Sequence, residues 1–496
     1  MRTVSLALLL LPLTGGAAVK SVSTPAQLQT ALSSAQAGDE IVLEDGTYAF
    51  SVNLTCAAEG TSAAPIVVRA KNRHAALIRF NAQEGFKVSG RYWTFDGLTV
   101  EGVCSNDQTC EHAFHVTGHA ENFVLRNSRV RDFNSQLKAN ATQNGSVWEM
   151  PHRGLIENNE IYDTRVRATG TPVNKLNIDT GDDWVVRDNE IHDFGKQGGV
   201  SYGAFMKSGG KRGLFERNRV LCAKDRTGET DTRIGLSFGG GGTGNQYCAP
   251  AFDPNVPCSP EHTDGIIRNN IVANCTDAAV YLNKAANTRV LFNTFVGNGL
   301  GVDFRYAAST GQATGNVMAS TVRNRDSATG TFTANRTGVD NATFASWYVA
   351  PLKGDLTLKG NVSSLIGAAP KNALAPEDFC LRTRPASATL GALEHSLGNC
   401  TPGTGGGTDG GTGTGGGTDA GTGGGTDAGT GTGGGTDAGT GLDAGTGGII
   451  PDAGTGPEEE APGDDDEDGG CSASPGLLPA LLALLAPLAL RRRARR

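Results

Sequence analysis

The sequence lacks the marks of several common protein classes. Its cysteines show no CxxC spacing, so a zinc ribbon or finger is not indicated. No serine nucleophile signature is present. The glycine run at 239–242 lacks the strand–loop–helix context and the Lys-Ser/Thr of a phosphate-binding loop, so it favours a loop between repeats. The apolar stretches at the two ends of the chain are too short for a typical membrane-spanning helix.

The N-terminal stretch has the pattern of an export signal. Arg2 precedes an apolar core at residues 4–13, and small residues follow. We expect a signal peptide over residues 1–18 with cleavage before Val19. No cysteine follows the expected cut, so an N-terminal lipid is not indicated.

The C-terminal stretch has the composition of a tether. Residues 401–470 are rich in Gly, Thr, Asp and Ala and end in an acidic block, so we expect a disordered linker. Residues 471–496 hold Cys471, a short apolar helix and an arginine cluster. This order resembles the C-terminal surface-sorting signals of myxobacterial proteins, which implies processing and anchoring at Cys471. A plain C-terminal membrane anchor is the alternative.

The tail also accounts for the net charge of −8. It carries 14 acidic residues at 401–470 and 5 arginines after residue 490, which leaves 37 acidic and 38 basic residues in residues 1–400. The body is therefore close to neutral, and the low isoelectric point says nothing about its ligand.

The body, residues 19–400, is dominated by a repeat. A hexapeptide with apolar ends recurs as FDGLTV, LRNSRV, IENNEI, VRDNEI, FERNRV, IRNNIV and LFNTFV, beginning at residues 95, 125, 156, 186, 215, 267 and 291. We interpret the interval of 52 residues as two coils, with IGLSFGGGG in the intervening one. Short alternating strands with this period bury their apolar side only when the coils stack. The pattern predicts an all-β fold, a right-handed parallel β-helix with asparagine ladders between coils.

The start of the body predicts a cap for this solenoid. Thr24 suits the N-cap and Pro25 the first position of a helix that ends at Gly38. One apolar face of this helix, formed by Leu28, Ala31, Leu32 and Ala35, would cover the open end of the stack.

The cysteines of an exported chain suggest disulfides. The local pairs are Cys104–Cys110, Cys248–Cys258 and Cys380–Cys400. Cys222 and Cys275 could join across coils, which would leave Cys56 without a partner.

A candidate site follows from the period, because residues one coil apart become neighbours ~4.8 Å apart. Asp179 lies 28 residues before Lys207 and should point outward with Asn177. The same strip is expected to hold carboxylates and cations from neighbouring coils and turns, namely Glu149, His152, Asp182, Asp183 and Arg233. Trp148 and Tyr202 are further candidates for substrate binding, and Arg212 is a further candidate for catalysis.

Such a strip suits β-elimination of a uronic-acid polymer. Asn177, Asp179, Asp182 and Asp183 supply oxygen ligands for Ca²⁺, although nothing in the sequence requires a metal. A metal or an arginine would neutralise the substrate carboxylate, and Lys207 would remove the proton α to it. Arg212 or Arg233 would stabilise the charge that develops.

MKSGG and the following ERNRV resemble the lysine coil of chondroitinase-B-like and alginate-lyase-like polysaccharide lyases. This resemblance implies a lysine base at Lys207, an arginine acid about one coil later, and calcium held by acidic residues before the lysine. The chain departs from the pattern in two places. GGVSYGAFM lacks the glutamates, and Phe238 stands where the arginine would be, with Arg233 out of register.

Plainer interpretations stay open. Lys207 and Asp179 could form a solvated ion pair between coils. Asp182 and Asp183 could simply occupy a turn. Glu149 and His152 flank Pro151 at a turn but are candidates for substrate binding. Trp148 and Tyr202 could stack on sugars or pack under the loops at 135–145 and 250–261.

We therefore expect an exported, surface-tethered monomer that acts on an acidic, uronate-containing polysaccharide and binds no nucleic acid. Its contact with the cell envelope would run through the C-terminal segment. A polysaccharide lyase is the first enzyme class and a glycoside hydrolase the second. A non-catalytic carbohydrate-binding, adhesive or structural surface protein is the alternative.

Overall fold

The computed structural model describes residues 16–228, 231–240 and 242–400. Most of the expected signal peptide (residues 1–18), the expected linker (401–470) and the segment with Cys471 (471–496) lie outside the described residues. Within the described residues, no helix is long and apolar enough to cross a membrane.

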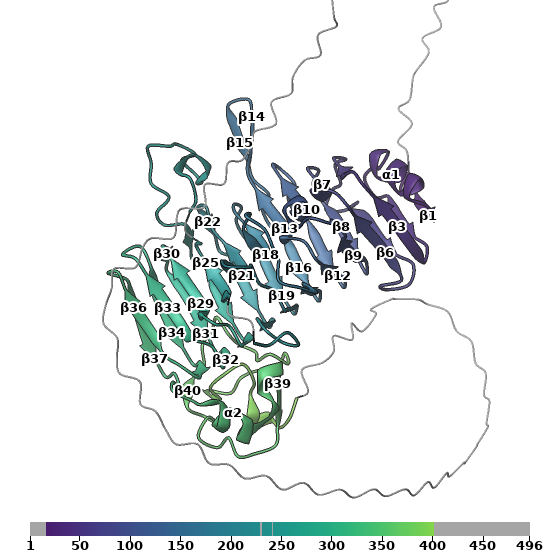
Figure 1. Ribbon diagram of the computed structural model, residues 1–496. Helices are drawn as coiled ribbons and strands as arrows, with labels where there is room; N and C mark the ends of the chain where they lie inside the picture. The colour runs from purple at the N-terminus through teal and green to yellow at the C-terminus, as the bar shows by residue number, and fades with distance from the viewer. Residues whose placement is uncertain (1–15, 229–230, 241, 401–496) are drawn as a thin grey trace, which may run out of the picture.

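The described chain is a right-handed parallel β-helix built from three long parallel sheets (Figure 1). Each coil contributes one strand to each sheet in turn. The strands of sheet A are β1 (Val19–Val22), β2 (Glu40–Leu43), β5 (Ile66–Ala70), β8 (Trp93–Asp96), β11 (Val124–Arg126), β16 (Leu155–Glu157), β19 (Val185–Arg187), β23 (Leu214–Glu216), β27 (Ile266–Arg268), β31 (Thr288–Leu291), β34 (Thr310–Thr314) and β37 (Thr329–Thr333).

Sheets B and C have ten strands each. Those of sheet B are β3 (Gly46–Phe50), β6 (Ala76–Phe80), β9 (Thr99–Gly102), β12 (Arg129–Arg131), β17 (Glu160–Tyr162), β20 (Glu190–His192), β24 (Arg219–Leu221), β28 (Ile271–Ala273), β32 (Thr294–Val296) and β35 (Val317–Met318). Those of sheet C are β4 (Leu54–Cys56), β7 (Glu84–Val88), β10 (His112–Thr117), β13 (Ser135–Asn140), β18 (Val173–Ile178), β21 (Val200–Met206), β25 (Thr232–Phe238), β29 (Ala278–Asn283), β33 (Leu300–Arg305) and β36 (Val322–Arg325).

The hexapeptides form the corner between sheets A and B, and they line up as rungs. Two details of their predicted spacing are wrong. Phe215 pairs directly with Ile267, so the 52-residue interval is one coil with a long excursion, and IGLSF belongs to β25 of that same coil. Ile267 pairs with Val290, so the seventh repeat begins at Val290 rather than at residue 291.

The fourth position of the repeat carries the predicted asparagine ladder. At each step from Asn159 the side-chain oxygen of one asparagine accepts hydrogen bonds from the backbone N–H and Nδ2 of the preceding one. Nδ2 also donates to a carbonyl of the preceding coil, as Asn218 does to Val186 at 2.8 Å. The ladder consists of Asn159, Asn189, Asn218, Asn270, Asn293, Asn316 and Asn335. Buried turn amides are therefore satisfied from coil to coil.

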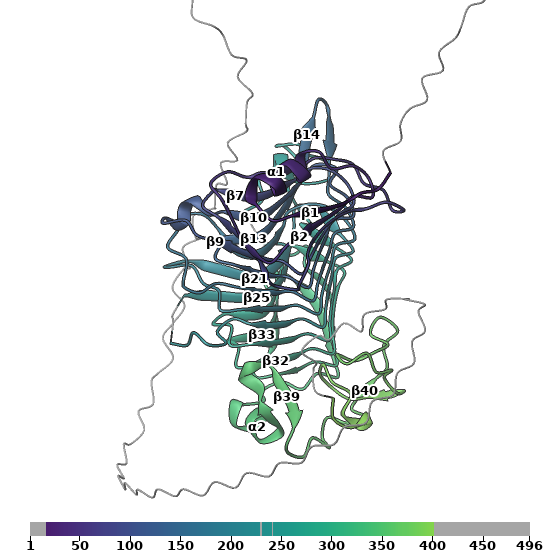
Figure 2. The same cartoon turned by 90° about the vertical axis from the view of Figure 1, so that its right-hand side faces the viewer.

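The N-terminal end of the stack is covered by a helix (Figure 2). Helix α1 (Pro25–Ser33) begins as predicted, with the Thr24 hydroxyl accepting from the N–H of Gln27 at 3.3 Å, and it buries Leu28 and Leu32. The C-terminal elements, α2 (Asn341–Trp347), β38 (Tyr348–Ala350), β39 (Asp355–Leu358) and the pair β40 (Ala369–Pro370) and β41 (Ser387–Ala388), pack on the outer side of the late coils, against residues of sheet B such as Leu221 and Val296. Helix α1 protects apolar surface that the first coils would otherwise expose, whereas the last strand, β37, remains largely exposed.

All four disulfides agree with the predicted pairs. They join Cys104–Cys110, Cys222–Cys275, Cys248–Cys258 and Cys380–Cys400. Cys56 is a buried free thiol, as expected from the odd count in the body. Burial in apolar surroundings raises its pKa, so this thiol is unreactive in the folded protein.

Candidate functional site

The outer face of sheet C carries polar side chains in two rows that run along the solenoid. Successive side chains of a strand point to opposite faces of the sheet, so the outward residues form the rows while residues such as Leu137, Ile178 and Met206 point into the core. Row one consists of Lys87, His115, Lys138, Asn177, Phe205, Ser237, Tyr281, Asp303 and Arg323. Row two, displaced by two residues, includes Asn140, Asp179, Lys207, Asn283, Arg305 and Arg325.

Asp179 lies between two lysines at the middle of these rows. Its Oδ1 is 3.4 Å from Nζ of Lys207, and its Oδ2 accepts a hydrogen bond from Nζ of Lys138. The pairing of Ile178 with Met206 places Asp179 beside Lys207, as the sequence predicted. Burial works to raise the pKa of Asp179, but the two lysines together hold that pKa below its usual value. The carboxylate is thus a fixed anion that positions two ammonium groups.

The surroundings of Lys207 restrict its side chain. Its Nζ lies 5.1 Å from the centre of the Phe205 ring, a cation–π distance, and only 7% of the residue is exposed. A Cβ on Gly240 would come within 3.3 Å of the Lys207 Cδ, so the loop after β25 approaches the lysine stem closely. These contacts hold the ammonium in one place, which a positioned acid–base group requires.

One oxygen atom at this position, Oδ1 of Asn177, has no hydrogen-bond partner among the described residues, and Asn177 is only 4% exposed. Buried polar atoms are seldom left unpaired. Oδ1 of Asp179, in the neighbouring row, is instead in ion-pair contact with Lys207. The Asn177 oxygen therefore marks a place beside this ion pair where a polar ligand could complete the contacts.

Arg233 and Arg212 do not join Lys207, and the predicted placement of Arg233 in the strip is wrong. Arg233 is buried near the other end of β25, where its guanidinium contacts Asp231 and donates to the carbonyl of Cys222. A Cβ on Gly203 or Gly235 would meet the core side chains of Val220 and Val272, so each glycine faces inward like the buried residue after it. The in–out alternation is therefore shifted by one before these glycines, which places Arg233 on the inward side. Arg212 lies in the turn after β22 (Gly210–Lys211) and pairs with Asp182 and Asp183.

The predicted calcium cluster does not assemble, because each of its carboxylates is already paired with a basic side chain. Asp182 and Asp183 are neutralised by Arg212, with Nε to Oδ1 of Asp183 at 2.7 Å, and this contact holds the pKa of Asp183 low. Asp179 is neutralised by the two lysines. Among the described residues, these three carboxylates form no group with ligand atoms within 4.8 Å of one another. Ca²⁺ prefers several uncompensated oxygen ligands, so this donor set does not fit it.

The residues predicted to bind substrate fall into two places. Tyr202 lies on the outer face of sheet C, edge-on to Phe205 at 5.4 Å, next to Ile234 and Tyr281. Trp148 and Glu149 lie on β15 (Val147–Glu149), which pairs with β14 (Thr142–Asn144) in a hairpin that projects from the solenoid (Figure 1).

Trp148 joins this hairpin to the other long excursion of the chain. Its ring stacks on Phe252 at 4.4 Å with an interplanar angle of 9°. Glu149 accepts from His119 at 2.8 Å, and His152 accepts from the backbone N–H of Asp182 at 2.9 Å. Trp148 therefore packs against a loop, whereas Glu149 and His152 hold turns together.

Several residues of the rows escaped sequence reasoning. Lys138 is the second cation on Asp179, and its signal was present, because QLKAN alternates like the other strands of sheet C. Tyr281 and Arg305 form a further polar pair two coils beyond Lys207, with Nη1 to the hydroxyl at 3.0 Å. His115 lies one rung before Lys138, between Glu84 and Asn140.

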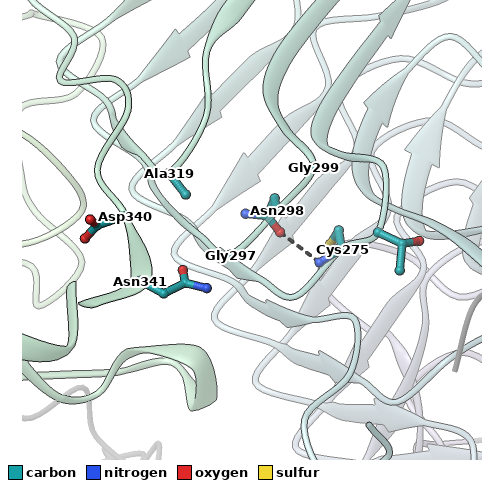
Figure 3. Close-up of a pocket in the computed structure, with 8 residues that line it drawn as sticks. Cys275, Gly297, Asn298, Gly299, Ala319, Asp340 and Asn341 are labelled. Atoms are coloured by element: carbon teal, nitrogen blue, oxygen red, sulfur yellow. Dashed lines mark hydrogen bonds between the residues drawn. The ribbon is translucent and has the colours of Figure 1, made fainter. Parts of the chain in front are cut away.

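A shallow hollow elsewhere on the molecule holds no comparable chemistry (Figure 3). It lies beside the Cys275 turn, where the N–H of Cys275 donates to Oδ1 of Asn298 at 2.9 Å. Its single ionisable side chain, Asp340, is the N-cap of α2. The outer rows of sheet C are the stronger candidate.

Comparison with known proteins agrees with this fold. Residues 14–171 match the family model described as Pel9A-like, right handed beta helix region. Comparison with curated proteins gives no match. Among solved structures, the pectate lyase Pel9A shares 17% identity at a TM-score of 0.45, covering 76% of this chain and 97% of its own.

Two further lyase structures are similar. An alginate lyase from Paenibacillus sp. str. FPU-7 shares 18% identity at a TM-score of 0.33, covering 64% of this chain and 99% of its own. A rhamnogalacturonan lyase shares 13% identity at a TM-score of 0.39, covering 74% of this chain and 90% of its own.

Proposed function

We propose that the protein binds an acidic, uronate-containing polysaccharide along the outer rows of sheet C and cleaves it by β-elimination. The observation that carries this proposal is the arrangement of Lys138, Asp179 and Lys207. Two ammonium groups fixed by one carboxylate suit a substrate that must have its carboxylate neutralised and the adjacent proton removed. The family model matched by residues 14–171 is named after Pel9A, which is a pectate lyase.

The residues divide the reaction between them. Lys138 would pair with the uronate carboxylate and make the proton on the neighbouring carbon more acidic. Lys207, once its ammonium has released a proton to water, would take the proton from that carbon. The electron pair of the broken C–H bond forms the new C=C bond, the bond to the glycosidic oxygen breaks, and that oxygen takes up a proton from Lys207 or water. Because the donor set does not fit Ca²⁺, no step is assigned to this metal.

The aromatic side chains beside the lysines suit the rest of the sugar. Tyr202, Phe205 and Tyr281 lie together on the same face. Aromatic rings offer an apolar surface, and a tyrosine hydroxyl adds a polar contact at its edge. Arg305, which donates to Tyr281, would meet a second carboxylate further along the polymer.

We also propose that the protein is exported and held at the cell surface by its C-terminal segment, with Cys471 as the processing site. The four disulfides support an oxidising compartment. A bound polymer would then be degraded outside the cell.

A non-catalytic polysaccharide-binding protein is the second candidate. The observation that favours it is Phe205, an uncharged residue in row one next to Lys207. Incubation with pectate, alginate and chondroitin separates the two functions. New ultraviolet absorbance from an unsaturated uronate supports the lyase, whereas retention on the polymer with no new absorbance supports the binding protein.

A further inference from the structure

A second cluster of side chains lies at the N-terminal end of the same rows. Glu84 begins β7, and His112 and His115 lie on β10, the next strand of sheet C. Their ligand atoms all lie within 4.8 Å of one another. Oε1 of Glu84 faces both rings, at 2.5 Å from Nδ1 of His115 and 4.0 Å from Nδ1 of His112. The other oxygen, Oε2, faces Lys87 at 3.6 Å.

The hydrogen bonds of His115 show which of its two ring nitrogens is free to bind a metal ion. Nδ2 of Asn140 donates to the carbonyl of Ala141 at 2.9 Å, which turns Oδ1 of Asn140 toward Nε2 of His115 at 2.7 Å. An amide oxygen only accepts, so Nε2 of His115 carries a hydrogen. Nδ1 then faces the Glu84 carboxylate, and this contact holds either a proton, as in a hydrogen bond, or a metal ion that takes the place of the proton.

His112 supplies an independent observation. Its Nδ1 is shielded from solvent and has no hydrogen-bond partner among the described residues. The 4.0 Å separation from Glu84 is too long for a hydrogen bond. Two imidazole nitrogens and one carboxylate oxygen thus converge, and Nδ1 of His112 is left without a hydrogen-bond partner.

We propose that Glu84, His112 and His115 bind a divalent transition-metal ion of the Zn²⁺ type. Two histidines and one glutamate are a known zinc donor set that leaves a position open. Ligand atoms this close together can share one ion at bond lengths of ~2.0–2.1 Å once the side chains adjust to it. The contact from His115 to Asn140 is the outer-shell bond that orients metal-binding histidines.

A second cluster, of two glutamates and one histidine, provides a contrast. Glu160, Glu190 and His192 also converge on sheet B. Their atoms are already engaged, because Glu160 pairs with Arg129 at 2.8 Å, Glu190 pairs with Arg219, and Nδ1 of His192 contacts Asp193 at 2.8 Å. Both glutamates of this cluster pair with arginines, and neither ring nitrogen of its histidine lacks a contact, so we expect it to bind no metal.

Zn²⁺ titration of the chelator-treated and desalted full-length protein tests the site by calorimetry. We expect one ion per chain, and at least tenfold weaker binding in Glu84→Gln and in His112→Asn. Glu160→Gln is the matched control and should bind as the wild type does. Absent binding, or equal binding in the wild type, Glu84→Gln and His112→Asn, would overturn the proposal.

X-ray absorption at the zinc edge of the loaded wild type needs no variant and so does not depend on their folding. Scattering from two imidazoles with nitrogen and oxygen ligands supports the site. A spectrum with sulfur ligands, or without imidazole scattering, contradicts it. Neither measurement requires catalytic activity, so the metal site can fail while the polysaccharide function stands.

Discussion

Asp179 and Lys207 are 28 residues apart in the chain but lie side by side on sheet C, with 3.4 Å between Oδ1 and Nζ. Parallel stacking of β18 and β21 creates this contact, because Ile178 and Met206 are partners in the register. The same stacking adds Lys138 from the preceding coil. A β-helix can therefore assemble a site from single residues of successive coils, all on one rigid face.

Replacing Lys207 and replacing Lys138 should affect catalysis in different ways. Lys207→Met removes the proposed base, so kcat on the best uronate polymer should fall ~10²–10⁴-fold. Lys138→Met removes the partner of the substrate carboxylate and should also raise KM. Initial rates of ultraviolet absorbance measure both effects. Lys353→Met is the control, because its side chain is 62% exposed and remote in the fold, and it should behave as the wild type does.

Calcium should not stabilise the protein. Asp179 is neutralised by lysines, and Asp182 and Asp183 by Arg212. An ion present at 100 times its Kd would add ~2.7 kcal/mol to the free energy of unfolding and raise Tm by several degrees. We expect no such rise in a thermal unfolding scan with added Ca²⁺. A clear rise that Asp182→Asn abolishes would contradict this account of the site.

The sequence predicted the solenoid because its signal is repetitive. The fold is favoured by the apolar alternation, by the asparagine of the hexapeptide and by the N-terminal helix. An error in placing one repeat does not alter the placement of the others. The larger spacing error arose where a single coil carries a long excursion, since a 52-residue interval can be read as two coils. The pairing of Phe215 with Ile267 shows that it is one.

The candidate site was only partly predictable for a different reason. Backbone register follows from the period, and it placed Asn177, Asp179 and Lys207 correctly. The direction of a long side chain depends on local bends and on the nearest opposite charge. Arg233 faces inward and pairs with Asp231, and Arg212 lies in a turn and pairs with Asp182 and Asp183. Neither partner can be read from spacing alone.

The asparagine ladder should carry measurable stability. Asn218 accepts from the N–H of Asn189 at 3.1 Å and donates to the carbonyl of Val186 at 2.8 Å. In Asn218→Ala these buried groups lose their partners, at a cost of ~1–3 kcal/mol each. Urea unfolding should show a loss of at least ~2 kcal/mol. Asn335→Ala, at the less buried end of the ladder, should cost less, and equal losses would contradict the argument.

His262 should make stability depend on pH. Burial lowers the pKa of His262 to about 3, and its ring stacks on Phe238 at 4.1 Å. The unfolded chain takes up a proton at this residue below pH ~6.5, whereas the folded protein does not until pH nears 3. Stability therefore falls with acidification across that window, by up to ~1.36 kcal/mol per pH unit from this residue.

A phenylalanine in its place isolates this effect. Below pH ~6.5 the stability of His262→Phe should fall less steeply than that of the wild type, while the two slopes agree above pH 7. Unfolding midpoints in urea between pH 4 and pH 8 measure the difference. Identical slopes below pH 6 would show that the imidazole is not held neutral in the folded protein.

The most direct measurement is a crystal structure of Lys207→Ala with a bound oligouronate. We predict density for the sugar over β13, β18 and β21, with a carboxylate beside Nζ of Lys138 and a ring against Phe205 or Tyr202. Density on another sheet, or a sugar bound only to the hairpin of Trp148, would contradict the placement of the site on the outer rows of sheet C.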